Sequence, residues 1–473
     1  MRTINDKTLS ARLRSALSDS FTGRTVAPGD SDYDSARRVW NATVDKRPAL
    51  IAVCESAADV SLAVRAARES GAPLSVRGGG HQVAGLAVCD SGLTIDLSGL
   101  RGVRLTDDAS IATAGGGCLL GDVDAANARA GRLVPAGVVS HTGLGGLALG
   151  GGFGWTFRNF GLTCDNIVGA EVVTADGSIV RAGQDDDSEL LWALRGGGGN
   201  FGVVTAFDLR THPVSDVLLG QAIFLLDDLP RAVAHYVEVM SEAPDALTAI
   251  CITACAPPIP GLPDGLVGRP IVMINAVWSG DLAAGEGPVG RLIDGAAPLV
   301  ATVDRMPYIA VQTMQDDLHP HGRRNYNKSR YLDRVDDGAI KALNDAGADL
   351  PGVHSQIEIL YLKGKAARVE PAATAFAHRD AAYILNVVAA WTEVEDTERH
   401  IAWARTTYAG FDQVGSNAGY INFLDAESGR VRSVYPGATY ARLQATKRRV
   451  DPEQVFAGNV PIDIGPAAER SAV

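Results

Sequence analysis

The sequence predicts an α+β fold with more than one domain. The chain has 473 residues, more than one compact core usually holds. Short strands and helices alternate over the first ~130 residues and again over 167–209. Residues 215–415 instead show longer alternating strands and amphipathic helices, which is typical of a separate sheet covered by helices on one face. We therefore divide the chain at 1–214, 215–417 and 418–473.

The first part contains apolar runs of strand length and one segment with helical spacing. Residues 93–97 show the alternation of a half-buried strand. In chain order, the predicted elements are strand 49–54, helix 55–70, strands 73–76, 93–97 and 110–114, and helix 119–130. Together these elements predict a first α/β unit.

The second α/β unit begins with a hairpin. Asp176-Gly177 is a hairpin turn signal between two β-branched runs. The predicted elements are strands 171–174 and 179–181, helix 188–194 and strand 203–209, followed beyond 215 by helix 230–240, strands 271–278 and 355–362, and helix 439–449. No internal repeat is present.

Composition excludes several classes of partner. Apolar residues make up 46% and charged residues 21%, as in an ordinary globular protein, and the formal net charge of −12 disfavours nucleic acid and anionic membranes. Residues 1–20 lack the apolar core of a signal peptide, and no run approaches ~20 apolar residues. We expect a cytoplasmic protein with six free thiols and no metal site. The sequence leaves a homodimer open.

Glycine is the compositional anomaly. The chain has 53 glycines, about 11% against a usual ~7%. They cluster at 78–80, 115–117, 143–154 and 196–202. Consecutive glycines allow backbone N–H groups to approach a dinucleotide pyrophosphate closely. The clusters match neither the Rossmann nor the P-loop pattern, because the Gly-x-Gly-x-x-Gly strand–helix turn and the Gly-Lys-Ser/Thr triplet are both missing.

Four motifs occur in the order of a known family. Residues 75–85, 135–155 and 191–204 resemble the three flavin loops of the vanillyl-alcohol oxidase superfamily in its berberine-bridge-enzyme-like branch, and 435–456 resembles its C-terminal segment. The resemblance implies a PCMH-type FAD-binding domain of two α/β subdomains. It also implies that 215–417 binds substrate on an antiparallel sheet and that 418–473 returns to the FAD-binding domain.

The same resemblance implies a set of cofactor-binding residues. They come from the three loops and from one position near the C-terminus. The set is Val76, Arg77, Gly78, Gly79, Gly80, His81, Gln82, Gly85, Gly137, Val138, Ser140, His141, Gly143, Gly145, Gly146, Gly154, Asn200, Gly202, Val203, Val204 and Asn459.

The resemblance also implies that His81 is joined to the flavin 8α-methyl group. A largely neutral imidazole is a suitable nucleophile for that carbon at pH 7. Many members of this branch add a second bond from a cysteine. The matching position here is Val139, so we expect a single histidyl link. His141 lies two residues further on, either near the flavin ring or as a loop residue without chemistry.

Glu358 is our first choice for the catalytic base. Strand periodicity places Gln356, Glu358 and Leu360 on one face and Ile357, Ile359 and Tyr361 on the other. A carboxylate between two isoleucines is poorly solvated unless it faces a cavity, and burial would raise its pKa toward that of a useful base.

Further site residues follow from the resemblance. Tyr420 and Asn422, which we predict to be catalytic residues together with Glu358, match a strand that returns to the flavin, with both side chains on one face. Tyr308, Tyr361, Asn386 and Trp391 are the predicted substrate residues. The basic stretch 319–330 could bind an anionic group, but we interpret it mainly as a solvated loop that leads into a strand.

These residues support an oxidase of a small secondary-metabolite-type alcohol or amine. The substrate would transfer a hydride to flavin N5, and dioxygen would reoxidise the flavin. The second loop also resembles that of flavin oxygenases of bacterial polyketide biosynthesis, so an oxygenase acting on a polyketide-like or aromatic substrate is an alternative. A drug-sequestering flavoprotein is the second alternative.

Overall fold

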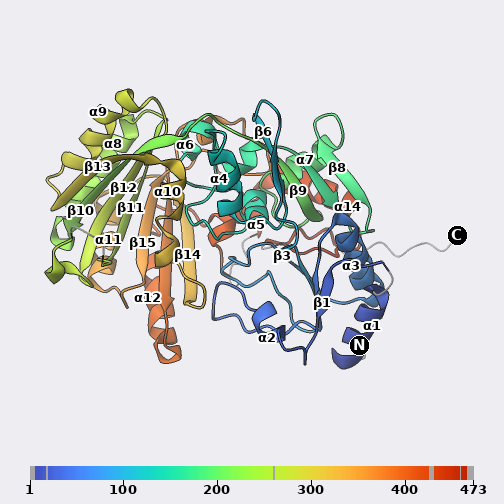
Figure 1. The fold of residues 1–473 in the computed structure, drawn as a ribbon. Coiled ribbons are helices and arrows are strands. Elements are labelled where there is room, and N and C mark those ends of the chain that lie inside the picture. The colour runs from blue at the N-terminus through green and yellow to red at the C-terminus, as the bar shows by residue number, and fades with distance from the viewer. Residues whose placement is uncertain (1–5, 18–19, 259–261, 426–430, 459, 466–473) are drawn as a thin grey trace.

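The strands form three sheets in the computed structural model, which describes residues 6–17, 20–258, 262–425, 431–458 and 460–465. The predicted α+β class is confirmed. Figure 1 shows the largest sheet with its helices at the left and the two smaller sheets at the right. No helix in the described ranges is long and apolar enough to span a bilayer.

The first sheet has four strands in the order β1-β2-β4-β3, with β1 antiparallel and the others parallel. The strands are β1 (Arg24–Val26), β2 (Leu50–Val53), β3 (Leu74–Arg77) and β4 (Leu93–Asp96), and helices α1 (Asp6–Leu17) and α3 (Ala57–Ser70) pack beside them. Ser56 caps α3 through the Asp59 N–H, and Gly71 ends it in a left-handed conformation. Strand β3 ends at Arg77, and the glycine loop at 78–80 follows it directly.

The second sheet is antiparallel, in the order β5-β6-β9-β7-β8. Its strands are β5 (Val103–Leu105), β6 (Ile111–Gly115), β7 (Ile167–Val173), β8 (Ile179–Gly183) and β9 (Val203–Arg210). Helices α4 (Leu120–Ala128) and α7 (Ser188–Leu194) contact its strands, and α14 (Gly437–Val450), from the C-terminal segment, contacts α7. Helices α5 (Leu144–Gly150) and α6 (Phe157–Phe160) come between β6 and β7 in the chain.

The third sheet has seven antiparallel strands in the order β13-β10-β12-β11-β15-β16-β14. The strands are β10 (Asp216–Leu225), β11 (Leu247–Cys255), β12 (Pro270–Trp278), β13 (Val300–Pro307), β14 (Arg324–Leu332), β15 (Gln356–Tyr361) and β16 (Tyr383–Trp391). One face is covered by α8 (Leu229–Glu242), α9 (Leu282–Asp294), α11 (Asp337–Ala348) and α12 (Thr397–Ala409). The short helices α2 (Tyr33–Ala36), α10 (Tyr308–Thr313) and α13 (Val431–Val434) lie outside these layers.

Three predictions about local structure are wrong. The sequence places strand 110–114 in the first α/β unit, but β6 belongs to the second sheet, because it pairs with β9 almost 100 residues later in the chain. The sequence also predicts a half-buried strand at 93–97, but β4 is buried along its whole length, because it lies between β2 and β3. Residues 420–423 form no strand: Tyr420 precedes a 3-10 turn at 421–423.

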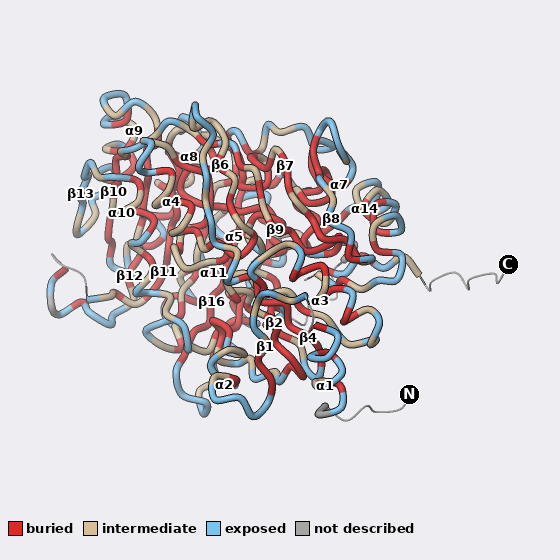
Figure 2. The backbone as a smooth tube through the Cα atoms, turned by 45° about the vertical axis from the view of Figure 1, so that its right-hand side comes forward, coloured by how far each residue is buried: buried red, intermediate tan, exposed pale blue. Residues whose placement is uncertain are grey.

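The face of the large sheet that its helices leave uncovered packs against the second sheet and the loops around it. Figure 2 shows buried backbone concentrated in the middle of the molecule. Ile250, Ile252 and Leu360 from the large sheet share one hydrophobic cluster with Phe153 and Phe207. Burial of this shared apolar surface is what fixes the large sheet against the flavin-loop side.

Asp124 of α4 is buried where α4 contacts α10. Its Oδ2 accepts a hydrogen bond from Gln312 Nε2 at 3.1 Å, and Oδ1 has no hydrogen-bond partner within the described ranges. Burial raises the pKa of this carboxyl from 3.8 to about 7. Between these two pKa values the folded state holds a proton that the unfolded chain releases. The contribution of this protonated carboxyl to the free energy of unfolding is therefore complete below pH 3.8 and is lost as the pH rises through 7.

We expect Asp124→Asn to stabilise the protein at alkaline pH. The amide keeps an acceptor for Gln312 and needs no proton, so the gain approaches at most about 4 kcal/mol above pH 7 and vanishes near pH 4. Urea unfolding from pH 4 to 9 measures it. Asp107→Asn, at an exposed carboxylate, is the control and should show no such pH trend. An equal change at every pH would contradict this assignment.

Candidate active site

A cavity of about 360 Å³ lies between the glycine loops and the uncovered face of the large sheet. One wall consists of backbone from the three flavin loops and from residues 456–458 of the C-terminal segment. The opposite wall is made by side chains of β14, β15 and β16, which neighbour one another in the sheet. The cavity therefore has one wall of backbone amides and one of side chains, with a size in the range of small-molecule sites.

The first two glycine loops touch each other through their backbones. A Cβ on Gly79 would lie 2.3 Å from Gly143 N, and a Cβ on Gly143 would lie 2.2 Å from Gly79 N. Gly116 joins the same contact, because a Cβ on Gly145 would lie 3.0 Å from its carbonyl oxygen. No residue other than glycine fits at Gly79 or Gly143 without moving backbone. This close packing leaves the N–H-rich cradle that a flavin dinucleotide requires, so the residues present fit FAD.

Most of the predicted cofactor residues line this cavity. They come from β3 and the loop after it, from the loop before α5, and from the start of β9. The lining includes Val76, Gly78, Gly79, Gly80, His81, Gln82, Gly137, Val138, Gly143, Gly145, Gly146, Gly202, Val203 and Val204.

The other predicted cofactor residues lie behind the lining and support it. The Arg77 guanidinium donates to the Ala36 carbonyl, and Ser140 donates to Asp316 through both N–H and hydroxyl. A Cβ on Gly85 would strike Val44 and one on Gly154 would strike Ala136. His141 and Asn200 have the separate roles given below, and Asn459 lies outside the described residues.

Asn200 ties the third glycine loop to the C-terminal segment. Its Oδ1 accepts from the N–H groups of Gly458 and Ile462 at 3.0 and 3.3 Å, and its Nδ2 donates to the Gly197 and Val460 carbonyls. Nearby, buried Lys447 donates to Asp451 and to two carbonyls. The side chain of Asn200 therefore supports the loop, because every polar atom of this side chain is used within the protein, and a cofactor contact through its backbone stays a prediction.

His81 lies at the edge of the cavity with its ring held on two sides. The ring stacks on Trp40, with 4.4 Å between centroids and 17° between planes. Its Nε2 lies 3.1 Å from Nδ1 of His141. Burial, and then the neighbouring histidines, hold the pKa of His81 well below its ordinary value. The imidazole is therefore neutral at physiological pH, which is the form that can act as a nucleophile.

Val139 also lines the cavity, where the branch carries its second flavin-linking residue. All six cysteines fall in the described ranges, are free thiols, and lie outside the cavity lining. Burial raises the pKa of the Cys164 and Cys118 thiols, so these two are unreactive.

Glu358 faces the cavity from the middle of β15. Its carboxylate accepts hydrogen bonds from Asn386 Nδ2 at 2.8 Å and from Gln356 Nε2 at 2.6 Å. Burial raises its pKa above the ordinary 4.5, although both hydrogen bonds lower it. A carboxylate with a raised pKa and two amide donors is suited to take a proton from a bound substrate.

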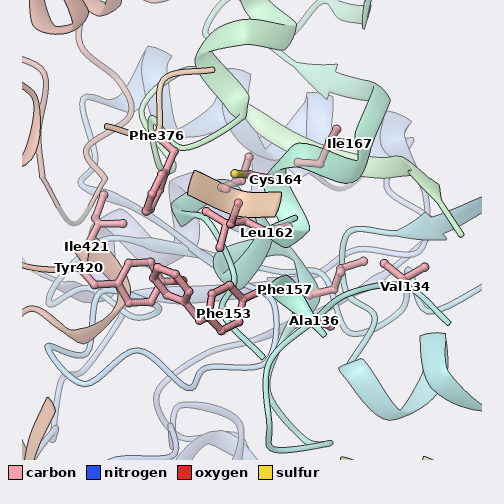
Figure 3. Packing of buried hydrophobic residues seen from close by; sticks show 14 of the residues in the cluster. Val134, Ala136, Phe153, Phe157, Leu162, Cys164, Ile167, Phe376, Tyr420 and Ile421 are labelled. Carbon is pink, nitrogen blue, oxygen red and sulfur yellow. The ribbon is translucent and has the colours of Figure 1, made fainter. Parts of the chain in front are cut away.

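Tyr420 and Asn422 meet beside the second glycine loop. The Tyr420 hydroxyl oxygen accepts hydrogen bonds from Gly152 N–H and from Asn422 Nδ2, each at 2.7 Å. Asn422 also donates to the Leu147 carbonyl at 3.1 Å. Figure 3 shows the Tyr420 ring beside Phe153, with centroids 4.7 Å apart, and Phe376 nearby. Both predicted residues line the cavity, although they are not on a strand.

Of the four predicted substrate residues, only Asn386 lines the cavity. Tyr361 lies on the helix-covered face of β15, under the guanidinium of Arg158, because strand alternation turns it away from Glu358. Trp391 stacks on His400 in the same helix-side core. Tyr308 is buried beside Asp124. These three assignments are corrected to structural roles.

The basic stretch is mostly structural as well. Residues 324–332 form strand β14, and Arg330 is 1% exposed, bonded to Asp412 and over the Tyr408 ring. Lys328 pairs with Asp425 at 2.6 Å. The solvated-loop interpretation is therefore wrong beyond Arg323. Only His319 and Asn327 of this stretch line the cavity, so it offers no cation there.

Several lining residues carried no usable signal in the sequence. Trp40, Asn327 and Val388 reach the cavity only through tertiary packing. Gly116 belongs to the glycine cluster at 115–117, but only the structure shows that it contacts Gly145. No group of three or more His, Cys, Asp or Glu side chains placed to hold a metal ion is found within the described ranges.

Comparison with known proteins identifies the family. An FAD binding domain family matches residues 48–183, and a berberine and berberine-like family matches 419–463. (R)-6-hydroxynicotine oxidase of Paenarthrobacter nicotinovorans is 31% identical over 96% of this chain and 99% of its own. An FAD-linked oxidoreductase of Dictyostelium discoideum is 30% identical over 80% and 81%.

Solved structures agree with the sequence matches. A variant of Physcomitrella patens BBE-like 1 superposes with a TM-score of 0.85 at 25% identity, covering 96% of this chain and 99% of that one. 6-Hydroxy-D-nicotine oxidase from Arthrobacter nicotinovorans gives 0.84 at 28% identity, covering 94% and 98%. The chain therefore belongs to the berberine-bridge-enzyme-like branch of the vanillyl-alcohol oxidase superfamily and is an FAD-linked oxidoreductase.

Proposed function

We propose that this enzyme is an oxidase of a small alcohol or amine of secondary-metabolite type, with FAD held by a single bond to His81 and with Glu358 as the base. The observation that carries the proposal is the cavity itself. It places His81 and the glycine cradle on one wall and a buried, amide-bonded carboxylate on the other.

The single link is supported by the residues around the loops. His81 is neutral and lines the cavity, and Val139 has no atom that could form a thioether. By resemblance, one bond instead of two leaves the flavin less oxidising.

When bound, FAD supplies the hydride acceptor and the route for electrons to dioxygen. Glu358 takes the substrate proton, and Asn386 and Gln356 hold its carboxylate in place. Tyr420 and Asn422 fix the position of the second loop through Gly152 and Leu147. Among the residues that the structure describes, the cavity lining contains no lysine or arginine, which favours neutral or cationic substrates over anionic ones.

The relatives support an oxidase of secondary metabolism. The relative that matches over 96% of the chain is a hydroxynicotine oxidase. A structural neighbour with a TM-score of 0.81, 25% identical, is an oxidoreductase that catalyses the terminal step of gilvocarcin biosynthesis. These names disfavour a drug-sequestering protein. We place the enzyme in the cytoplasm, with a small molecule and dioxygen as its partners, and leave a homodimer open.

An oxygenase is the second candidate, favoured by one comparison. An FAD-dependent monooxygenase of Fusarium proliferatum is 37% identical over 42% of this chain. Turnover under ¹⁸O₂ separates the two reactions. We expect one hydrogen peroxide per substrate oxidised and no label in the product. Label in the product with little peroxide would establish the oxygenase and overturn the oxidase.

We expect the flavin to stay with the protein after acid denaturation. Proteolysis of the acid precipitate should yield one flavin peptide, which contains His81, and His81→Ala should release free FAD. The readout is flavin fluorescence on peptides identified by mass. A flavin on any cysteine peptide, or all of the FAD in the supernatant, would contradict the single histidyl link.

We expect Glu358→Gln to lower kcat by about 10²–10⁴-fold, because the amide cannot take the proton. In the wild type, kcat/KM should fall as the pH drops through the raised pKa of Glu358, since only the carboxylate is a base. Stopped-flow flavin reduction measures both effects. Glu393→Gln, at an exposed glutamate past β16, is the control. Full activity of Glu358→Gln would assign the base elsewhere.

A further inference from the structure

We propose that His141 takes the proton that His81 loses when FAD becomes attached, and that it thereby selects Nδ1 of His81 as the nitrogen that bonds to the flavin. This inference rests on the histidyl link proposed above. It assigns His141 as a positioning residue that acts through His81, since His141 itself lies outside the cavity lining.

The hydrogen bond between the two rings allows two placements of the proton, and we assign Nε2 of His81 as the donor. Nε2 of His81 and Nδ1 of His141 are 3.1 Å apart, so one of these nitrogens carries the shared proton. With Nε2 as the donor, Nδ1 of His81 keeps its lone pair and is the nucleophilic nitrogen. The stacked indole of Trp40 holds the ring plane, and a half-turn of the imidazole that exchanged its nitrogens would break the hydrogen bond to His141.

Both rings are fixed by one segment of the other domain. Asp316 accepts hydrogen bonds from Ser140 N–H at 2.8 Å and from the Ser140 hydroxyl at 2.5 Å, which anchors the residue before His141. The His319 carbonyl accepts from Trp40 Nε1 at 2.8 Å, which anchors the ring beneath His81. The histidine pair is therefore pre-organised from both sides, as a reacting group and its supporting residue need to be.

A third histidine continues from His141 toward solvent. The His321 ring lies 5.0 Å from that of His141, between centroids, and 6.2 Å from that of His81. His321 is exposed, whereas His81 and His141 are partly buried. The order His81, His141, His321 thus leads from the cavity edge to water, and a proton accepted by His141 has a way out.

The chemistry of attachment explains why an acceptor is needed. The new bond joins Nδ1 of His81 to the carbon of the flavin 8-methyl group, and one C–H bond of that group breaks. The methyl proton would pass to water and the electron pair would stay on the flavin, while the Nε2 proton of His81 would pass to Nδ1 of His141; these two protons balance those that peroxide later carries. Dioxygen then takes the two electrons with two protons, which gives hydrogen peroxide and oxidised, linked flavin.

Without a proton acceptor, attachment would leave a positive charge on the His81 ring. Burial and the three neighbouring histidines already disfavour that charge, as the lowered pKa of His81 shows. Transfer of the proton to His141 keeps the His81 ring neutral as the bond forms.

The test measures attachment, not turnover. Full-length apoprotein from riboflavin-starved cells is mixed with saturating FAD, and acid-insoluble flavin is followed over time. We expect His141→Ala and His141→Asn to bind FAD yet attach it about 10²-fold more slowly than wild type. The asparagine keeps a hydrogen-bond acceptor near His81 but cannot take the proton. Added imidazole should speed attachment in His141→Ala, and His321→Ala should slow it to a smaller extent.

Two comparisons separate the outcomes. Attachment in wild type should be slower in D₂O, a readout that needs no variant, and His354→Ala, at an exposed histidine outside the lining, should match wild type. Attachment at the wild-type rate in His141→Asn, or no solvent isotope effect, would overturn the role of His141 and leave the link intact. Acid-stable flavin in His81→Ala would instead overturn the link itself.

Discussion

The backbone contact between Gly79 and Gly143 is the constraint on which the site depends. Two loops that are more than 60 residues apart meet there with no room for a Cβ on either side. His81 follows the first glycine by two residues and His141 precedes the second by two. The contact that builds the phosphate cradle therefore also sets the two imidazoles within hydrogen-bond distance. One close backbone contact thus shapes the cofactor cradle and also positions the histidine pair of the proposed attachment.

The large sheet supplies the reactive side chains because it is buried on both faces by different neighbours. Helices cover one face, and the flavin-loop side covers the other. Polar residues on the second face cannot reach bulk water, so they bond to one another, as Glu358 does with Asn386 and Gln356. The same enclosure that removes water from these groups raises the pKa of Glu358 above its ordinary value.

Sequence patterns predicted whatever depends on local spacing or on a run of glycines. The alternation in β15 correctly placed Glu358 apart from Tyr361, and the glycine loops were correctly placed together. Residues that reach the site through tertiary packing escaped prediction. Trp40 arrives from a loop near α2, and Arg330 is buried by a partner 82 residues away. Asn200 was assigned to the cofactor because its loop is, and only the fold shows that its amide binds other backbone.

The hydrogen bonds of Asn200, Lys447 and Asp451 join segments that are synthesised at different times. Residues 456–458 complete one wall of the cavity, and that wall is held by hydrogen bonds to a loop more than 250 residues upstream. Because synthesis runs from the N-terminus, Asn200 leaves the ribosome well before Gly458 does. This wall of the cavity can therefore form only once both segments have been made.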